Sequence, residues 1–276
     1  MAKINGVVFY DGPSKIDGTP IIGIATLGTA NAKTGNLVQT WILLKNTNPL
    51  DAINTGDDAS ICGDCPLRGR IADASERTHK ATKFPGKTAN KGRSCYVLVQ
   101  NAPLNIWRSF NRGLYPKLDT KVHRRYFIGR GLRYGSYGDP TAIPMKAWDK
   151  LAAICTGKAE PGYTHQWRNL KFKKWAGRVM ASTHTLEENE LAKANGWRTF
   201  RTIGNVADKS PDEIICPASV EGGFKATCET CGACNGRRNM ADVRKSVAIV
   251  AHGGDGKLDL VRKVIENRRI ALSMAA

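Results

Sequence analysis

The chain has 276 residues, of which 41% are hydrophobic and 24% charged; this is ordinary for a folded soluble protein and long enough for a sizeable core. No apolar run approaches the roughly 20 residues that span a bilayer, and the N-terminus lacks the apolar stretch of a secretory signal. We therefore expect a cytoplasmic protein without membrane contact. Lys and Arg number 42 against 24 Asp and Glu, and the formal net charge of +18 favours DNA or RNA as a partner.

The first elements that the sequence predicts are strands with Gly- and Asn-rich connectors. They cover Val7–Tyr10, Ile21–Leu27 and Val38–Leu44, with a turn at Asp11-Gly12. Residues 46–95 are predicted to be loop-like, with a strongly basic stretch over Ser75–Arg93, and we expect a metal to order this segment. Residues 1–98 are thus predicted to form a β-rich N-terminal segment.

Strands and helices alternate after about residue 100. Strands are predicted over Arg130–Tyr137, Pro161–Thr164, Arg178–Ser182, Trp197–Ile203 and Ser246–Ala251, and helices over Pro144–Ile154, from Thr185 to Gly196, and over Lys257–Arg269. Repeated strand–helix–strand units imply a parallel sheet with right-handed crossovers, in an open or barrel form. Residues 99–276 are predicted to be an α/β core, either as a second domain or continuous with the first segment.

Four of the eight cysteines form a C-terminal group: Cys216, Cys228, Cys231 and Cys234. The last three are each separated by two residues, which lets one short loop wrap around several corners of a cuboidal cluster. Cys216 supplies a fourth thiolate and is followed by Pro217, as in ferredoxin loops. We predict a closed four-thiolate site that holds a 4Fe–4S cluster.

Cys62, Cys65 and Cys95 form an N-terminal group, with its fourth position open or filled by Cys155. Three thiolates and an open position are what a cluster needs to bind a substrate or cofactor at one iron. Because Cys155 lies at the apolar end of a predicted helix, a buried free thiol is the competing interpretation for it. The sequence therefore predicts one or two clusters, with any reactivity at the N-terminal group.

Zinc is the alternative metal for both cysteine groups. Structural zinc sites usually take two separated Cys-x-x-Cys pairs, and neither group has that pattern. Zinc can still use three cysteines of one crowded loop, so ligand type and spacing favour iron–sulfur without deciding the metal.

Polar side chains follow several predicted strands, at the edge where ligand sites of parallel sheets lie. Asp139, His165, His184 and His252 are the catalytic candidates on this basis. For each histidine alone, a hydrogen-bonded structural role is the competing interpretation. The convergence of all four predicts a polar edge beside the cysteines.

One segment interleaves cations with aromatic residues and is the predicted nucleic-acid-binding site. Its residues are Arg168, Lys171, Lys173, Lys174 and Arg178, with Trp167 and Trp175. Bases can stack on such aromatics while the cations meet phosphates. An amphipathic helix with its aromatics in the core and its lysines in water explains the same pattern.

Several stretches resemble an uncharacterised family of bacteriophage proteins: Cys62–Arg68, Cys95–Val97 with Trp107, Gly135–Pro140, Gly162–Trp167 and Cys228–Cys234. More distantly, Gly-Asp-Pro, Thr-His-Gln-Trp and the final cysteines resemble phage proteins grouped near the radical-SAM barrels. That resemblance implies a TIM- or radical-SAM-like α/β barrel with a cluster near the strand ends, S-adenosylmethionine as a further cofactor, and the infected host cell as the setting. The compact radical-SAM signature Cys-x-x-x-Cys-x-x-Cys is replaced here by Cys62, Cys65 and the distant Cys95.

Three functions compete on these grounds. The leading hypothesis is a phage iron–sulfur protein that binds nucleic acid. The second is a radical-SAM-like or other cluster-dependent enzyme acting on nucleic acid or nucleotides, so catalysis is left open. The third is a zinc-stabilised adaptor that binds a host protein.

Overall fold

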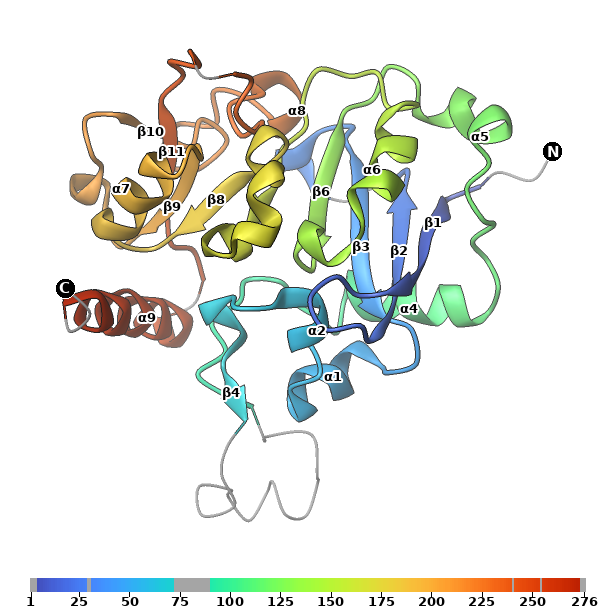
Figure 1. Ribbon diagram of the computed structural model, residues 1–276, viewed down its shortest axis with the longest axis horizontal. Coiled ribbons are helices and arrows are strands. Elements are labelled where there is room, and N and C mark those ends of the chain that lie inside the picture. The colour runs from blue at the N-terminus through green and yellow to red at the C-terminus, as the bar shows by residue number, and fades with distance from the viewer. Residues whose placement is uncertain (1–3, 29–30, 72–89, 240, 254, 274–276) are drawn as a thin grey trace.

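The two larger sheets formed by the described strands lie side by side in the computed structural model (Figure 1). The structure describes residues 4–28, 31–71, 90–239, 241–253 and 255–273. The fold is mixed α/β, and the predicted parallel sheet is confirmed.

The first sheet has the order β1-β2-β3-β6. Its strands are β1 (Gly6–Pro13), β2 (Pro20–Thr26), β3 (Val38–Leu44) and β6 (Leu132–Tyr137). The pairs β1–β2 and β2–β3 are antiparallel, whereas β3 and β6 are parallel. The sheet therefore joins the N-terminal β-rich segment to the first strand of the predicted α/β core.

The second sheet is parallel throughout, with the order β10-β11-β9-β8-β7. Its strands are β7 (Tyr163–Thr164), β8 (Met180–Thr183), β9 (Thr199–Ile203), β10 (Glu213–Ile215) and β11 (Ser246–Val250). A parallel bridge between Tyr134 and Gly162 joins β6 to the start of β7. The Tyr134 amide also donates to the Pro161 carbonyl at 2.9 Å, so the parallel strands of both sheets point their carboxyl ends the same way.

A closed barrel is not shown by the described strands: β1 and β10 are the outer strands of the two sheets. The barrel form that the radical-SAM resemblance implies is thus a proposal, whereas the parallel order of the strands is established. A short antiparallel pair, β4 (Arg70–Ile71) with β5 (Asn90–Lys91), stands apart from both sheets.

The predicted turn at Asp11-Gly12 is wrong. β1 continues to Pro13, Asp11 and Gly12 pair with Ile22 and Ile21 of β2, and the chain reverses over residues 14–19. Lys45, just after β3, donates to both oxygens of Asp11 at 2.9 Å, so Asp11 is used for a cross-strand ion pair. The turn instead uses Gly18, whose φ of +87° favours glycine.

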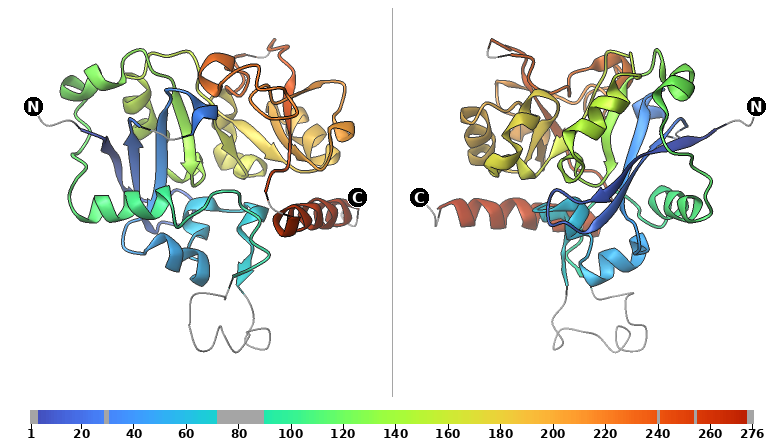
Figure 2. Two further views of the ribbon diagram at one scale, coloured as in Figure 1. Left: turned by 180° about the vertical axis from the view of Figure 1, so that it is seen from behind. Right: turned by 45° about the vertical axis from the view of Figure 1, so that its right-hand side comes forward.

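Helices connect the strands and cover the sheets (Figures 1 and 2). The α-helices are α1 (Pro49–Thr55), α2 (Ala59–Cys62), α4 (Ala102–Asn111), α5 (Thr120–Phe127), α6 (Met145–Ala152), α7 (Leu186–Ala194), α8 (Cys228–Cys231) and α9 (Asp255–Ser273). Short 3-10 helices cover Ala32–Thr34, Pro66–Arg68, Pro140–Ala142, Gln166–Arg168, Leu170–Gly177 and Val206–Asp208. No described helix is long and apolar enough to cross a membrane.

An aromatic cluster anchors α6 against the first sheet. Trp148 is fully buried, with its ring centroid 4.7 Å from that of Phe9 and 4.9 Å from that of Tyr134. The Trp148 indole N–H donates to the Pro140 carbonyl at 3.0 Å, which fixes the turn that leaves β6. This packing sets the carboxyl end of β6, where Asp139 lies.

Candidate functional site

Seven of the eight cysteines line one cavity with a volume of about 400 Å³. They are Cys62, Cys65, Cys95, Cys216, Cys228, Cys231 and Cys234. Asp139, His165 and His252 also line it, each within two residues of the carboxyl end of β6, β7 or β11. The cavity therefore occupies the position beyond the strand ends where ligands bind in parallel sheets.

Two short pairings bring Cys95 back to Cys62 and Cys65. β4 and β5 pair antiparallel, and the Leu67 carbonyl accepts the amides of Ser94 at 3.1 Å and Cys95 at 2.9 Å. The long insertion between the second and third cysteines is thus closed at its base.

A buried ion-pair network supports this cysteine loop. Asp58 has no exposed side-chain surface and pairs with Arg68 at 2.7 Å and Arg93 at 3.1 Å. Burial raises the pKa of the Cys62 thiol well above its usual value, with further contributions from Asp58 and the neighbouring cysteines. Burial raises the pKa of the Cys65 thiol to about 12, with Cys95 as the next cause. The three thiols are therefore close enough to repel one another as thiolates.

Two hydroxyl groups on the cavity wall are buried without a hydrogen-bond partner among the described residues. They are Ser94 Oγ and Tyr137 Oη. Burial raises the pKa of Tyr137 well above its usual value, and Cys62 is the next cause. A buried hydroxyl without an acceptor is costly, so these two groups are suited to donate to something that is bound beside the N-terminal cysteines.

The C-terminal cysteines are positioned by a strand end and a capped helical turn. Cys216 follows β10, and its amide donates to the Ala248 carbonyl of β11 at 2.8 Å. Thr227 and Thr230 form a reciprocal capping box at α8, and Gly232 ends that turn in the left-handed region at φ +61°. The loop geometry therefore turns Cys228, Cys231 and Cys234 toward the same cavity.

The Cys234 thiol interacts with the other three cysteines of its group and with the hydroxyl of Tyr163. Burial raises the pKa of its thiol to about 12; Tyr163 donates a hydrogen bond to it, and Cys216, Cys228 and Cys231 add to the rise. Arg198 holds the backbone on both sides of Cys234 by donating to the carbonyls of Ala233 at 2.9 Å and Asn235 at 2.6 Å.

Within the described ranges, no three His, Cys, Asp or Glu side chains are arranged to hold a single metal ion. Cys155, the alternative fourth ligand of the N-terminal group, is 5% exposed and does not line the cavity. Burial raises the pKa of its thiol to about 12, with Glu160 as the next cause. The packing of Cys155 matches the interpretation as a core thiol.

Asp139 organises the polar floor of the cavity. Its carboxylate accepts hydrogen bonds from the Thr164 hydroxyl at 2.9 Å, the Thr141 hydroxyl at 2.8 Å and the His165 amide at 2.9 Å. Burial raises the pKa of this carboxyl to about 6, although these hydrogen bonds lower it. The Asp139 amide donates to the Ile61 carbonyl at 2.6 Å, which ties the end of β6 to the helical turn that carries Cys62.

His165 lies between the cavity and a second, fully buried histidine. Its Nε2 is 3.1 Å from Nε2 of His184, and the two rings are nearly parallel. Burial, and then His184, lower the pKa of His165 well below its usual value; burial lowers that of His184 to about 4. Both rings are therefore neutral at pH 7, with one N–H shared between them. His184 does not line the cavity itself.

Glu188 anchors His184 from α7. Its Oε2 accepts the His184 amide at 2.7 Å, and its Oε1 accepts from Arg168 at 2.7 Å and from Arg268 of α9. Because α9 also places Val261 on the cavity wall, and Lys257 donates to the Cys95 carbonyl at 3.2 Å, this helix covers part of the site.

The aromatic residues of the predicted nucleic-acid-binding segment face the core. Trp167 and Trp175 are each 4% exposed, so neither indole is available to stack on a base. Arg168 pairs with Glu188, and Arg178 with Asp149. The exposed cations of this segment are Lys171, Lys173 and Lys174, together with part of Arg168. The amphipathic alternative describes this packing, although the segment is 3-10 helix over most of its length.

The structure adds Arg133 to the site, a residue that lies inside the strand predicted over Arg130–Tyr137. Arg133 lies in β6 and lines the cavity, and its Nη2 donates to Tyr96 Oη at 3.1 Å. A charged residue inside a parallel strand is the signal that identifies it, because such strands are usually continuous hydrophobic runs. Comparison of the chain with models of known families, with curated proteins and with solved structures gives no match.

Proposed function

We propose that the protein is a two-cluster iron–sulfur enzyme whose substrate binds in the cavity between the cysteine groups. The observation that supports this most is the convergence of seven thiols on one cavity beyond the strand ends. Catalysis is preferred over a purely structural role because the wall also carries the polar groups Asp139 and His165.

The residues fit such clusters on two counts. The first is the donor set, since Cys thiolates are the usual ligands of iron–sulfur clusters. The second is the pair of buried hydroxyls, Ser94 Oγ and Tyr137 Oη, because hydrogen bonds to cluster sulfurs are a common way to set the reduction potential. When bound, a cluster would supply one-electron redox chemistry at the cavity wall. Cys216, Cys228, Cys231 and Cys234 would hold one cluster, and Cys62, Cys65 and Cys95 the other.

The side chains on the floor of the cavity would handle protons. His165 is neutral at pH 7 and its ring is held by His184, so it would relay a proton, taken up at one ring nitrogen and released from the other, rather than keep one. The His184 ring lies behind it as a second proton carrier. Val261 of α9 and the apolar side chains of the wall would limit the access of water.

The three-cysteine group extends the proposal to S-adenosylmethionine as a co-substrate. Support comes from the order of the parallel strands in space, which is β3, β6, β7, β8, β9, β11 and β10. The first of them, β3, is the strand that precedes Cys62 in the chain. Three protein thiolates would leave one cluster position for the ligand. Calorimetric titration of anaerobically prepared protein with S-adenosylmethionine tests this point, and absence of binding removes the radical-SAM version while leaving the clusters.

Iron and sulfide analysis of anaerobically purified protein tests the main proposal. We expect about eight irons and eight sulfides per chain, since each 4Fe–4S cluster contributes about four of each. Cys62→Ala and Cys228→Ala should each remove about half of the iron. Cys155→Ser is the matched control, because it removes a thiol outside the cavity and should keep all of it.

Two results would contradict the proposal. Protein that contains zinc and no iron would favour the zinc-stabilised adaptor. Full iron content in Cys62→Ala and Cys228→Ala would show that the cavity cysteines do not hold the metal.

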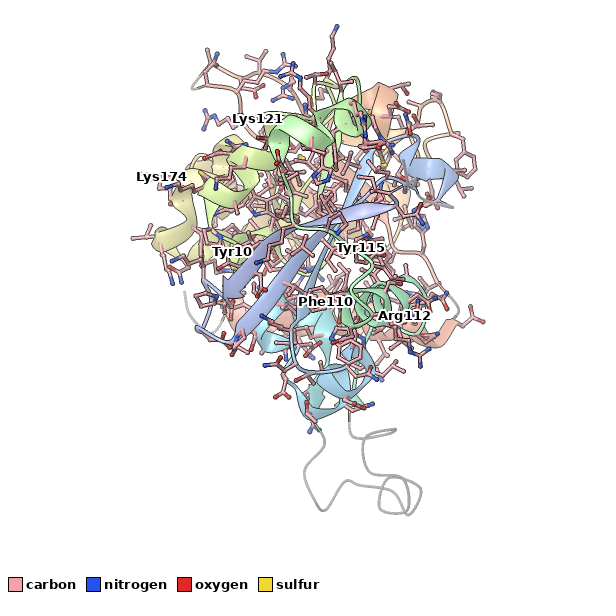
Figure 3. The ribbon with its side chains drawn as sticks, turned by 90° about the vertical axis from the view of Figure 1, so that its right-hand side faces the viewer. Tyr10, Phe110, Arg112, Tyr115, Lys121 and Lys174 are labelled. Carbon is pink, nitrogen blue, oxygen red and sulfur yellow. The ribbon has the colours of Figure 1, made fainter. Side chains whose placement is uncertain are left out.

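A second candidate function, nucleic-acid binding, is favoured by an exposed basic surface on α4, α5 and the segment between them. Its cations are Arg108, Arg112, Lys117, Lys121 and Arg124, and the salt bridges of the described residues include none of them. Figure 3 shows Arg112 and Lys121 on the face that carries Tyr10 and Tyr115. These cations lie on one face and have no carboxylate partners, so they are suited to bind a phosphate backbone. The segment that follows His165 is less suited, because its tryptophans are buried.

A further inference from the structure

Arg133 is a cation on the cavity wall without a carboxylate partner. It is half-buried, and the salt bridges of the described residues do not include it. Its guanidinium meets the Tyr96 hydroxyl at 3.1 Å and interacts electrostatically with Tyr96, Tyr163 and Cys228. A guanidinium that is partly removed from water is stabilised when an anion meets it, because Arg is always charged in proteins.

The rest of the cavity strengthens the positive field at this point. Lys33 also lines the wall and has no salt bridge among the described residues. Asp139 is the one carboxylate on the described lining, and its oxygens are occupied by Thr141, Thr164 and the His165 amide. The wall therefore offers two cations and no available carboxylate.

The surface beside Arg133 is aromatic and apolar. The rings of Tyr163 and Phe200 are 4.2 Å apart between centroids and tilted by 39°, and Ile249 packs in the same apolar cluster. Such a wall suits the flat or apolar body of a small organic molecule.

We propose that Arg133 binds the oxyanion, carboxylate or phosphate, of a small organic substrate whose body packs against Tyr163 and Phe200. The inference deepens the proposed function and rests on it for the cavity being a substrate site. Arg133 is then a specificity-determining residue: its planar guanidinium forms two parallel hydrogen bonds with an oxyanion and excludes neutral analogues.

Calorimetric titration with paired probes tests this inference on anaerobically prepared protein. Adenosine 5'-monophosphate against adenosine reports on phosphate, and benzoate against benzamide reports on carboxylate. We expect the anion of at least one pair to bind about tenfold or more tightly than its neutral partner, the size of one charge-assisted contact. Arg133→Gln should bring that ratio close to one, and Arg133→Lys should keep part of it.

Lys146→Gln is the matched control, since it removes one positive charge from the exposed surface of α6, away from the cavity, and should leave the ratio unchanged. Equal affinities within both pairs, no measurable binding of any probe, or an unchanged ratio in Arg133→Gln would overturn the inference. Loss of iron from Arg133→Gln would also overturn it, because Arg133 would then serve as the counter-charge of the Cys228 group. Iron content is measured in the same samples. If wild-type protein contains no iron but still binds the anion more tightly than its neutral partner, the proposed function fails while this inference stands.

Discussion

The Nε2 atoms of His165 and His184 lie 3.1 Å apart, with ring planes only 5° from parallel. One hydrogen can occupy that contact, so one imidazole donates and the other accepts while both stay neutral. A second proton would place two N–H groups against each other beside Arg168 and Arg268. The pair is therefore stable only while at least one Nε2 is unprotonated.

This contact predicts a loss of stability in acid. A histidine in the unfolded chain binds its proton near pH 6.5, whereas burial lowers the pKa of His184 to about 4 in the folded protein. Between these pH values the unfolded chain holds more protons than the folded one. The free energy of unfolding therefore falls as the pH falls. Asp139 acts in the opposite direction below about pH 6, since burial raises its pKa to about 6 from 3.8.

Replacement of His184 by Asn should remove its share of this dependence, about 2 kcal/mol between pH 6.5 and pH 5. Urea unfolding at both pH values measures the difference. His252→Asn is the control, because His252 is exposed and should leave the wild-type pH dependence intact. If His184→Asn loses as much stability in acid as the wild type does, the assignment of the acid sensitivity to this pair is wrong.

Asp58 should be more important for stability than an average carboxylate. Its side chain is fully buried between Arg68 and Arg93, which are 19% and 15% exposed, so Asp58→Ala leaves two poorly hydrated guanidinium groups without this counter-charge. We expect a loss of about 3–5 kcal/mol in the free energy of unfolding. Asp11→Ala provides the comparison, since Asp11 makes a half-exposed ion pair with Lys45 and should cost less than about 1 kcal/mol. Similar losses in the two variants would contradict this account.

Two glycines of the C-terminal cysteine segment should respond differently to alanine. A Cβ at Gly222 would overlap the backbone carbonyl of Cys216, whereas a Cβ at Gly232 meets nothing within 4 Å. Gly222→Ala should therefore displace Cys216 and lower the metal content of the C-terminal group. Gly232→Ala carries only the cost of its φ of +61°, about 1 kcal/mol, and should keep the metal. Metal analysis of both proteins decides, and equal retention would show that Cys216 is not a ligand.

Nucleic-acid affinity should depend on the basic surface of α4 and α5. The double variant Arg112→Gln with Lys121→Gln should weaken DNA binding and reduce the slope of log affinity against log salt by roughly 0.9 for each phosphate that is no longer neutralised. Lys173→Gln with Lys174→Gln is matched in charge and lies in the segment that the sequence alone favours. Fluorescence anisotropy over a salt series compares the two, and a larger effect of the Lys173 and Lys174 variant would return the interface to that segment.

The strands were predictable because their hydrophobic patterns are bounded by clear turn residues. The range Val38–Leu44 agrees with β3 at both ends, and the spacing of Thr185 and Glu188 located the start of α7. Only half of the predicted capping box forms. The Thr185 hydroxyl accepts the Glu188 amide, but the Glu188 carboxylate binds the His184 amide and two arginines instead of the backbone of Thr185. The orientation of the Glu188 side chain is determined by buried partners from other elements, which the spacing of residues along the helix does not indicate.

The residues that line the candidate site could be predicted from the sequence, whereas their arrangement in space could not. Cysteine spacing identified both groups, but the return of Cys95 depends on the pairing of Arg70–Ile71 with Asn90–Lys91, which two-residue strands do not reveal in sequence. Alternating cations and aromatics suggested base stacking at Trp167 and Trp175, whereas tertiary packing buried both rings. Arg133 lay inside a predicted strand, and only the assembled cavity gives its charge a role.

The cavity wall is assembled from residues as far apart as Asn31 and Val261. During synthesis the thiols of Cys62, Cys65 and Cys95 leave the ribosome well before β11 and α9 exist to enclose them. A chain that stops ahead of β11 would contain all seven cavity cysteines, but it would lack the Ala248 carbonyl that holds the Cys216 amide and the helix α9 that covers part of the cavity. Under the proposed function, delivery of metal to the first group and closure of the cavity would therefore be separate events during synthesis, and metal would reach the first group before α9 covers it.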